Sequence, residues 1–252
     1  MRRYWLVIAI LSVSFVMSFT AQAQLTKGLV FAMTFEEGKG NVVHDVSGQG
    51  NHGEVVGDSD WSAGEFGGGF HFDGETHIAV PNAEPLSSLS HPMSVGCWVN
   101  PDELGGWRSV VEMDKEVVAG GWKIGFHDSR AVVWTTYRVK DFIATTPVEV
   151  NKWTHIAATW DGAQAIIYVN GKPDAPIAGG GVIDVKDVPS LDIGWRRTTG
   201  SSFYVGYIDD VFVYNEVLSE KEVNDIMGGL SALAVKPGFK ATTTWGYIRE
   251  TY

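Results

Sequence analysis

The 252-residue chain has one cysteine, Cys97, so an intrachain disulfide is excluded. A chain without disulfides is held together by its hydrophobic core or by a metal ion. We expect Cys97 to be a small buried residue rather than a reactive thiol, because it lies in the apolar run Met93–Val99. Basic residues are also scarce, since 19 Lys and Arg stand against 30 Asp and Glu, a formal net charge of −11. This balance argues against a nucleic-acid-binding surface.

Motifs of several catalytic classes are missing. The seven histidines have no His-x-x-x-His spacing and a single cysteine cannot form a Cys-x-x-Cys pair, so the sequence contains no recognisable zinc motif. There is no Gly-x-Ser-x-Gly turn of the serine hydrolases and no phosphate-binding loop. Hydrolase, zinc and nucleotide chemistry of these kinds therefore have no support in the sequence.

Long apolar runs are missing too, except at the N-terminus. Arg2 and Arg3 precede an apolar run from Tyr4 to Phe19, and Ala21-Gln22-Ala23 then provides a small-residue cleavage site. This pattern predicts a secretory signal peptide over residues 1–23, cleaved after Ala23, and a secreted protein. The alternative is an uncleaved membrane anchor, but the run is short for a spanning helix. We expect no membrane span in the mature chain.

The rest of the sequence is typical of β-structure. Ten Trp and thirty Gly with little helical periodicity suit aromatic-rich strands joined by tight turns. Short candidate strands recur at fairly regular intervals, which predicts an all-β fold, a two-sheet antiparallel β-sandwich (jelly roll), over residues 24–229. The candidate strands are Leu29–Phe35, Gly69–Asp73, His77–Val80, Met93–Asn100, Ser109–Met113, Trp122–His127, Ala131–Thr136, Phe142–Thr145, Thr154–Trp160, Ala165–Asn170, Ser190–Gly194 and Tyr204–Tyr214.

One short C-terminal helix is expected over Glu220–Met227. The segment Ser219-Glu220-Lys221-Glu222 has the pattern of a capping box, and Gly228-Gly229 follows the helix as a stop signal. Residues 230–252 contain Pro, Gly and three successive Thr with weak periodicity. We interpret them as a tail or linker.

Five segments together resemble a known family. They are Phe31–Gly38, His44–Gly57, Trp153–Gly162, Tyr168–Lys172 and Tyr207–Val223. In this order they are similar to the LamG-like jellyroll family of the concanavalin A-like lectin/glucanase superfamily. The resemblance implies a β-sandwich whose first and last strands are neighbours at one edge. The family includes sugar-binding modules, adhesion domains and spacers, so the resemblance does not by itself fix a function.

The segment from Asp45 to Gly53 is rich in glycine and oxygen donors, which predicts a fixed loop that could hold Ca²⁺. Side-chain oxygens and exposed carbonyls of this loop would supply ligands, and an aspartate of the last strand would complete the set. The candidate ligands are Asp45, Ser47, Gly50, Asn51, Asp209 and Asp210. Asp210 is favoured over Asp209, because strand alternation places Asp209 with the apolar Val211. In the alternative, Asp45 and Asn51 cap their own turn while Asp209 binds backbone amides.

The segment Glu112-Met113-Asp114-Lys115-Glu116 is the strongest catalytic candidate. It is similar to the Glu-x-Asp-x-Glu signature of related glucanases, in which the outer carboxylates act as nucleophile and acid/base. The nearby Ala119-Gly120-Gly121 favours a solvated hairpin loop from Asp114 to Gly121 instead. We therefore assign no catalytic residue, and keep a glucanase as the alternative.

Carbohydrate binding requires aromatic platforms beside fixed polar groups. Trp107-Arg108 and Trp195-Arg196 place such pairs near predicted turns, and would form a ligand site if they met on one rim. Trp61, Trp122 and Trp134 also lie near turns; for any single Trp the alternative is a core or rim position. The sequence thus predicts a secreted, non-catalytic module that binds carbohydrate or an extracellular glycoprotein. A purely structural domain is a further alternative.

Overall fold

The computed structural model describes residues 25–114, 120–137, 140–181, 183–197 and 202–230. The expected signal peptide (1–23), Glu116 of the catalytic candidate and residues 231–252 of the expected tail lie outside these ranges. No helix within the described ranges has the length and apolar character needed to cross a membrane.

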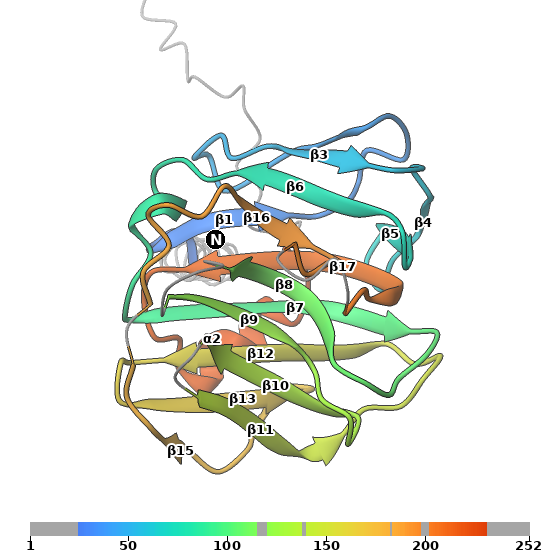
Figure 1. Cartoon of the computed structure of the whole chain (residues 1–252). Helices are drawn as coiled ribbons and strands as arrows, with labels where there is room; N and C mark the ends of the chain where they lie inside the picture. The colour runs from blue at the N-terminus through green and yellow to red at the C-terminus, as the bar shows by residue number, and fades with distance from the viewer. Residues whose placement is uncertain (1–24, 115–119, 138–139, 182, 198–201, 231–252) are drawn as a thin grey trace, which may run out of the picture.

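Two antiparallel sheets pack face to face as stacked layers (Figure 1). The described part of the first sheet has the strand order β14-β13-β12-β7-β17-β5-β4, with β1 paired to β17 and β15 paired to β13. Its strands are β1 (Leu29–Met33), β4 (Trp61–Ala63), β5 (Gly68–Asp73), β7 (Met93–Pro101), β12 (Thr154–Trp160), β13 (Gln164–Val169), β14 (Lys172–Pro173), β15 (Ile177–Ala178) and β17 (Val205–Tyr214).

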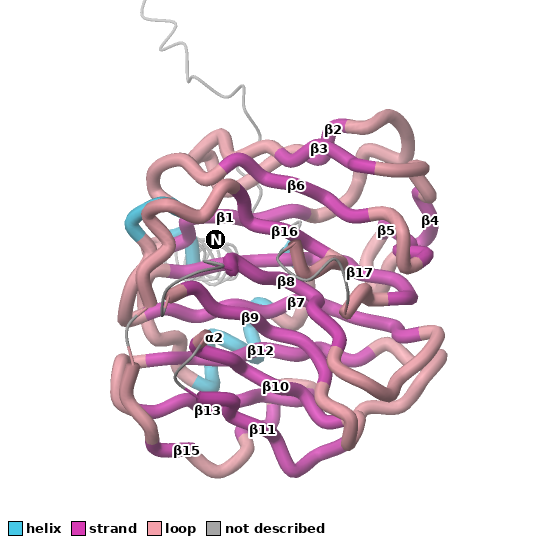
Figure 2. Tube along the Cα trace, viewed as in Figure 1, coloured by secondary structure: helices cyan, strands magenta, loops and turns pink. Residues whose placement is uncertain are grey.

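The second sheet has eight described strands in the order β11-β10-β9-β8-β16-β6-β3-β2. They are β2 (Val42–Val43), β3 (Gly53–Val56), β6 (His77–Pro81), β8 (Arg108–Asp114), β9 (Gly121–Phe126), β10 (Ala131–Thr136), β11 (Lys140–Pro147) and β16 (Ser190–Ile193). Figure 2 shows how strands dominate both layers. This architecture confirms the predicted two-sheet antiparallel sandwich.

The core fills the space between the sheets with alternate residues of each strand. Cys97 of β7 is fully buried there, as expected, and burial raises the pKa of its thiol. Trp122 and Trp134 are also core residues: their rings stack with centroids 5.5 Å apart, and neither is more than 1% exposed. These two tryptophans are therefore packing residues and not surface platforms.

A second apolar cluster covers the outer face of the nine-stranded sheet. Helix α2 (Glu220–Ile226) buries Val223 and Ile226 against Phe212 and Tyr214 of β17. The capping box is confirmed, since the Ser219 side chain accepts a hydrogen bond from the Glu222 backbone N–H while the Glu222 carboxylate accepts one from the Ser219 backbone. Leu230, the first residue of the expected tail, is fully buried in the same cluster.

Two expectations need correction. The candidate strands omitted Gly53–Val56, which directly follows the predicted loop and forms strand β3, with Val55 buried in the core. The first strand does pair with the last, as Met33 lies opposite Val211. However, β17 is an interior strand that also pairs with β5 and β7, so it does not lie at the sheet edge.

Candidate functional site

A row of polar side chains crosses the outer face of the eight-stranded sheet. Asp141 lies opposite Thr135, and Thr135 opposite Lys123. Lys123 in turn lies opposite Glu112, and Glu112 opposite Asp192. Directly opposed residues share one face of a sheet. Their strand neighbours point into the core, so this row faces outward.

Glu112 and Asp114 are buried beneath the segment 195–197 rather than solvated in a turn. Glu112 is 0% exposed; its Oε2 accepts the Tyr137 hydroxyl at 2.8 Å and its Oε1 accepts the Arg197 backbone N–H at 3.1 Å. Burial raises the pKa of Glu112 to about 7. Asp114 Oδ2 lies 3.1 Å from Arg196 Nε. Strands β8 and β9 do form the expected hairpin, but Asp114 is its last paired strand residue, opposite Gly121, and is not part of the loop.

A second ion pair holds the segment 195–197 against the sheet. The Arg197 guanidinium donates two hydrogen bonds to Asp192, from Nε at 2.9 Å and from Nη2 at 2.8 Å. This bidentate geometry is specific to Arg and stronger than a neutral contact. Ser190 donates its hydroxyl to the same carboxylate at 3.0 Å. The buried acids of this face therefore hold Arg196 and Arg197 in fixed positions.

Arg196 and Arg197 each line a cavity. The first, which we call the Trp107 pocket, has a volume of about 440 Å³. It is lined by Trp107, Lys123, Thr135, Thr136, Tyr137, Lys140, Asp141, Arg196 and Ser202. The second, the Arg197 pocket, has a volume of about 590 Å³. It is lined by Val42, His52, Gly53, Glu54, Val56, Ala79, Pro81, Pro189, Ser190 and Arg197.

Aromatic and cationic groups lie together in the Trp107 pocket. The Trp107 ring meets His127 edge-on at 4.8 Å, and Lys123 Nζ lies 4.6 Å from the Trp107 ring centroid. The Arg196 guanidinium lies 4.8 Å from the ring centroid of Tyr137. Trp107 is only partly buried, although Lys123 and His127 contact its ring.

The structure brings together two of the four predicted ligand-binding residues. Trp107 and Arg196 line the same pocket. Arg108 instead pairs with Glu103 at 3.0 Å. Trp195 instead packs against His77, with ring centroids 4.1 Å apart, and this contact holds its indole ring.

The sequence interpretation missed Lys123, a charged residue between two core residues of β9. That alternation alone indicates an outward-facing polar side chain. Its place beside Trp107 depends on how β9 and β8 pair, and the local sequence does not contain that information.

The predicted calcium loop is tied to β1 by its own hydrogen bonds. Asp45 Oδ1 accepts the backbone N–H groups of Ala32 at 3.0 Å and Ser47 at 2.9 Å, and Oδ2 accepts that of Asn51 at 2.9 Å. Asn51 Nδ2 donates to the Val30 carbonyl at 3.3 Å. This arrangement matches the alternative in which Asp45 organises its own turn. Three backbone amides already occupy most of the acceptor positions of this carboxylate, which leaves little room for a metal ion.

Asp209 and Asp210 occupy an irregular part of β17. Register shifts between Asp209 and Phe212, and Asp210 has a φ of 50°. Ile208 and Val211 both face the core, so simple alternation, which placed Asp209 with Val211, was wrong here.

Burial raises the pKa of Asp209 to about 8 and that of Asp210 to about 6. Asp209 Oδ2 accepts the Phe66 N–H at 3.0 Å and Asp210 Oδ2 accepts the Leu230 N–H at 2.9 Å. Asp209 Oδ1 is buried and has no hydrogen-bond partner in the part of the chain that the structure describes, and a hard cation would satisfy such an oxygen. Yet within the described ranges no three His, Cys, Asp or Glu residues are grouped so as to hold a metal ion. Calcium binding stays a prediction.

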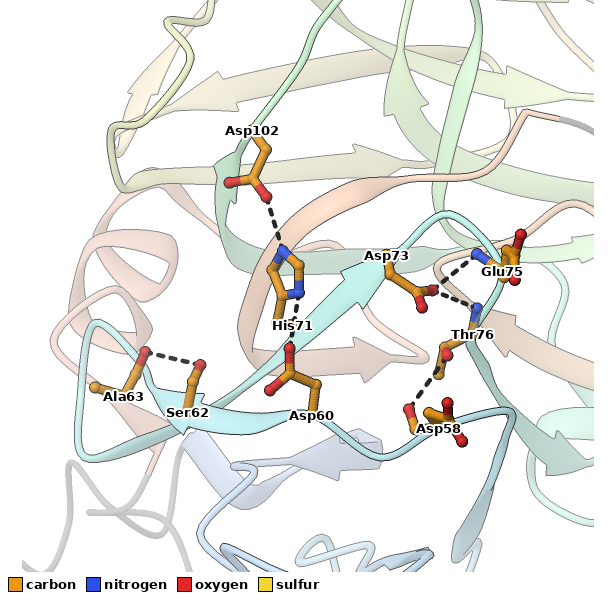
Figure 3. Close-up of polar contacts among 9 residues, drawn as sticks. All are labelled: Asp58, Asp60, Ser62, Ala63, His71, Asp73, Glu75, Thr76 and Asp102. Atoms are coloured by element: carbon orange, nitrogen blue, oxygen red, sulfur yellow. Dashed lines mark hydrogen bonds and ion pairs between the residues drawn. The ribbon is translucent and has the colours of Figure 1, made fainter.

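A separate polar link lies on the nine-stranded sheet (Figure 3). His71 Nδ1 lies 3.0 Å from Asp60 Oδ2, and Nε2 lies 2.7 Å from Asp102 Oδ2. Both ring nitrogens can donate only when the ring is protonated. The two carboxylates bind opposite sides of the imidazole, so they do not converge on a single point where an ion could sit. This link ties the β4–β5 hairpin to the end of β7.

Solved structures with the same fold include a domain in complex with a saccharide, the binding domain of a toxin and a sialidase. One is domain 4 of AbnA, a GH43 extracellular arabinanase from Geobacillus stearothermophilus, in complex with arabinotriose: TM-score 0.61, 17% identity, covering 79% of this chain and 98% of that chain. Another is the binding domain of the botulinum neurotoxin of serotype G, at TM-score 0.62 and 18% identity, covering 79% of this chain and 50% of that chain.

A third similar structure is an enzyme, Trypanosoma rangeli sialidase in complex with sialic acid, at TM-score 0.60 and 17% identity, covering 90% of this chain and 40% of that chain. The chain thus spans half of the neurotoxin binding domain and two fifths of the sialidase. At these identities the likeness shows the fold alone. The fold is shared by binding modules and by glycosidases.

No curated protein matches this sequence significantly. A family model does match, over residues 72–224, which is more than half of the chain. The match covers the strands that build the Trp107 pocket and the polar row beneath it. The chain belongs to the concanavalin A-like lectin/glucanases superfamily.

Proposed function

We propose that the chain is a secreted, non-catalytic saccharide-binding module and that its ligand occupies the Trp107 pocket. The observation that carries the proposal is a partly exposed indole, Trp107, in a polar cavity of about 440 Å³. A sugar ring has an apolar face of C–H groups that packs on an aromatic ring, and hydroxyls that need fixed hydrogen-bonding groups at its edge. The pocket offers both.

The hydrogen-bonding groups of this pocket are held in place by the sheet. Thr135 and Thr136 belong to β10 and Lys123 to β9, so their positions follow from strand register. Thr135 donates its hydroxyl to Asp141 Oδ1 at 2.6 Å, which fixes both side chains. A rigid site of this kind binds without the entropic cost of ordering a loop.

The buried acids support binding rather than catalysis. A glycosidase needs two carboxyl groups that reach the glycosidic bond or its water. Glu112 is covered completely and both of its oxygens are occupied, by Tyr137 and the Arg197 amide. Asp114 is committed to Arg196. Both acids therefore serve to position the pocket wall.

The test is a glycan array probed with the whole chain and two variants. Trp107→Ala removes the proposed platform, and Trp153→Ala is the matched control, because Trp153 is also partly buried but neighbours Tyr207 on the other sheet. We expect the wild type and Trp153→Ala to bind a shared set of glycans and Trp107→Ala to lose them. Silence of the wild type across the array would favour a purely structural domain.

A glycosidase is the second candidate, and one observation favours it. Glu112 and Asp114 lie two residues apart on β8, and burial raises the Glu112 pKa to about 7, a value suited to a general acid. Reducing-sugar release from laminarin or xyloglucan, abolished by Glu112→Gln, would establish this function. We expect no release of reducing sugar by the wild type or by Glu112→Gln.

A further inference from the structure

The Trp107 pocket gathers positive charge in an acidic protein. Three of its lining residues, Lys123, Lys140 and Arg196, are cationic, and Asp141 is the acid among them. The chain as a whole has a formal net charge of −11. The lining of this cavity is therefore positively charged, whereas the composition leads one to expect negative charge. A positively charged cavity attracts anionic ligands.

Two of these cations are partly satisfied by the protein. Arg196 Nε binds Asp114, while the Nη groups of Arg196 donate to no residue in the described ranges. Lys140 Nζ donates to the Ala178 carbonyl. Asp141, which could neutralise a neighbouring cation, accepts the Thr135 hydroxyl. The lining thus retains Arg196 Nη donors that no acceptor in the described ranges uses, beside the ion pair with Asp114.

Lys123 is the least satisfied of the three. Its side chain is only 2% exposed, and burial lowers the pKa of its ammonium. The group lies over Trp107, but across the described ranges it forms no hydrogen bond or ion pair. Glu112 is its opposite residue on β8, yet the oxygens of Glu112 are occupied by other donors. A buried charge without an acceptor is costly, so an incoming acceptor gains more here than at an exposed lysine.

We infer that the Trp107 pocket selects an anionic saccharide, and that Lys123 is the residue that determines this selectivity. The inference rests on the proposed function. The sugar ring lies against Trp107, and its carboxylate or sulfate group accepts hydrogen bonds from Lys123 and from the free donors of Arg196. The cation–π contact holds the ammonium over the Trp107 ring, so a saccharide that packs on Trp107 has its acidic group close to Lys123. A cationic sugar would be repelled by the same three side chains.

The test uses the whole chain and calorimetric titration with three probes. They are oligogalacturonate, which carries carboxylates, a sulfated galactan oligosaccharide and a neutral galactan oligosaccharide of similar length. We expect at least one anionic probe to bind about tenfold or more tightly than the neutral probe. Its affinity should also fall as salt concentration rises, whereas binding of a neutral sugar should not. The carboxylated and sulfated probes distinguish the two sources of charge.

Lys123→Met supplies the residue-level test. Methionine keeps the apolar stem but removes the ammonium, and Lys152→Met, at a largely exposed lysine paired with Glu149, is the matched control. We expect Lys123→Met to reduce the affinity for the anionic probe about tenfold and the control to leave it unchanged. Thermal unfolding of each variant shows that the fold is retained. If Lys123→Met does not fold, the salt dependence of wild-type binding decides whether the pocket selects an anionic saccharide.

The outcomes separate the two proposals. Equal affinity for neutral and anionic probes, unaffected by Lys123→Met, would overturn the anion selectivity and leave saccharide binding in place. Binding of an anionic probe that survives both Trp107→Ala and Lys123→Met would place the site elsewhere and overturn both. Failure of every probe and of the glycan array would likewise overturn both.

Discussion

Lys123 Nζ lies 4.6 Å from the centroid of the Trp107 ring. The two residues come from different segments, one within β9 and the other directly before β8, and they meet because these strands form a hairpin. An aromatic face beside a buried ammonium is a combination that packing alone does not require. It gives the outer face of the eight-stranded sheet a defined place for an apolar ring and for a negative group.

The stability of the chain should respond to Glu112→Gln with a clear pH dependence. Burial raises the pKa of the folded carboxyl from 4.5 to about 7. Between these values the unfolded state loses its proton and the folded state keeps it, so wild-type stability falls as pH rises. Glutamine does not titrate, so the variant lacks this dependence. The difference in the free energy of unfolding between the variant and the wild type should therefore shift by about 3 kcal/mol in favour of the variant from pH 4.5 to 7. Urea unfolding at several pH values measures it; parallel curves would contradict the buried, protonated Glu112.

His155→Phe should protect the protein against acid. His155 is 0% exposed, neither ring nitrogen has a hydrogen-bond partner among the described residues, and its ring stacks on Phe212 at 6.0 Å. Burial lowers its pKa from 6.5 to about 3. The neutral ring is therefore favoured in the folded state, and stability is lost as pH falls below 6.5.

Between about pH 6.5 and pH 5 this loss is about 2 kcal/mol, and the Phe variant should not show it. Denaturant unfolding at both pH values provides the measurement. His44→Phe is the control, because His44 is largely exposed and its loss removes no buried ring. An acid-induced loss of equal size in the wild type and in His155→Phe would show that another group is responsible.

Calcium should raise the melting temperature if the sequence prediction holds. Asp209→Asn is a better test than a substitution of Asp45. Asp45 binds three backbone amides, so its removal destabilises the loop with or without a metal. With a calcium ion on Asp209, the Asn variant should lose the calcium effect and melt lower than wild type.

Without an ion, the Asn variant should melt higher above pH 8, because the raised pKa of Asp209 makes its ionised form unfavourable in the folded state. Melting curves with added calcium and with a chelator distinguish the two cases. Identical wild-type melting curves with calcium and with the chelator would overturn the calcium prediction.

His71→Gln should loosen the β4–β5 hairpin. The imidazole links Asp60 and Asp102 through its two nitrogens, and a glutamine cannot span both (Figure 3). We expect a loss of about 1–2 kcal/mol in the free energy of unfolding. Hydrogen exchange should rise locally in β4 and β5. Unchanged exchange there would show that the link does not hold the hairpin.

The sequence predicted those parts of the fold that depend on local pattern. Ala131–Thr136 and Thr154–Trp160 were predicted to the residue, because apolar residues mark these strands and turn residues follow them. The helix start at Glu220 followed from the capping box of Ser219 and Glu222. Gly53–Val56 was not among the predicted strands, since glycine and polar residues precede it and the strand is held in place by its pairing with β6.

The site was harder to predict because it depends on contacts between distant segments. Trp107 and Arg196, two of the four candidate residues, line one cavity, but Lys123 was overlooked and Trp195 packs on His77. Local spacing places a side chain on a face; it does not say which residue of another strand lies opposite. The bulge at Asp210 is a further case, since one residue of positive φ reverses the alternation that follows it.

A crystal structure of the whole chain with a bound acidic oligosaccharide tests the central claim most directly. The account predicts a sugar ring packed on Trp107, with its carboxylate or sulfate within hydrogen-bonding distance of Lys123 and Arg196. A sugar bound on the nine-stranded sheet, or at the loop around Asp45, would contradict it.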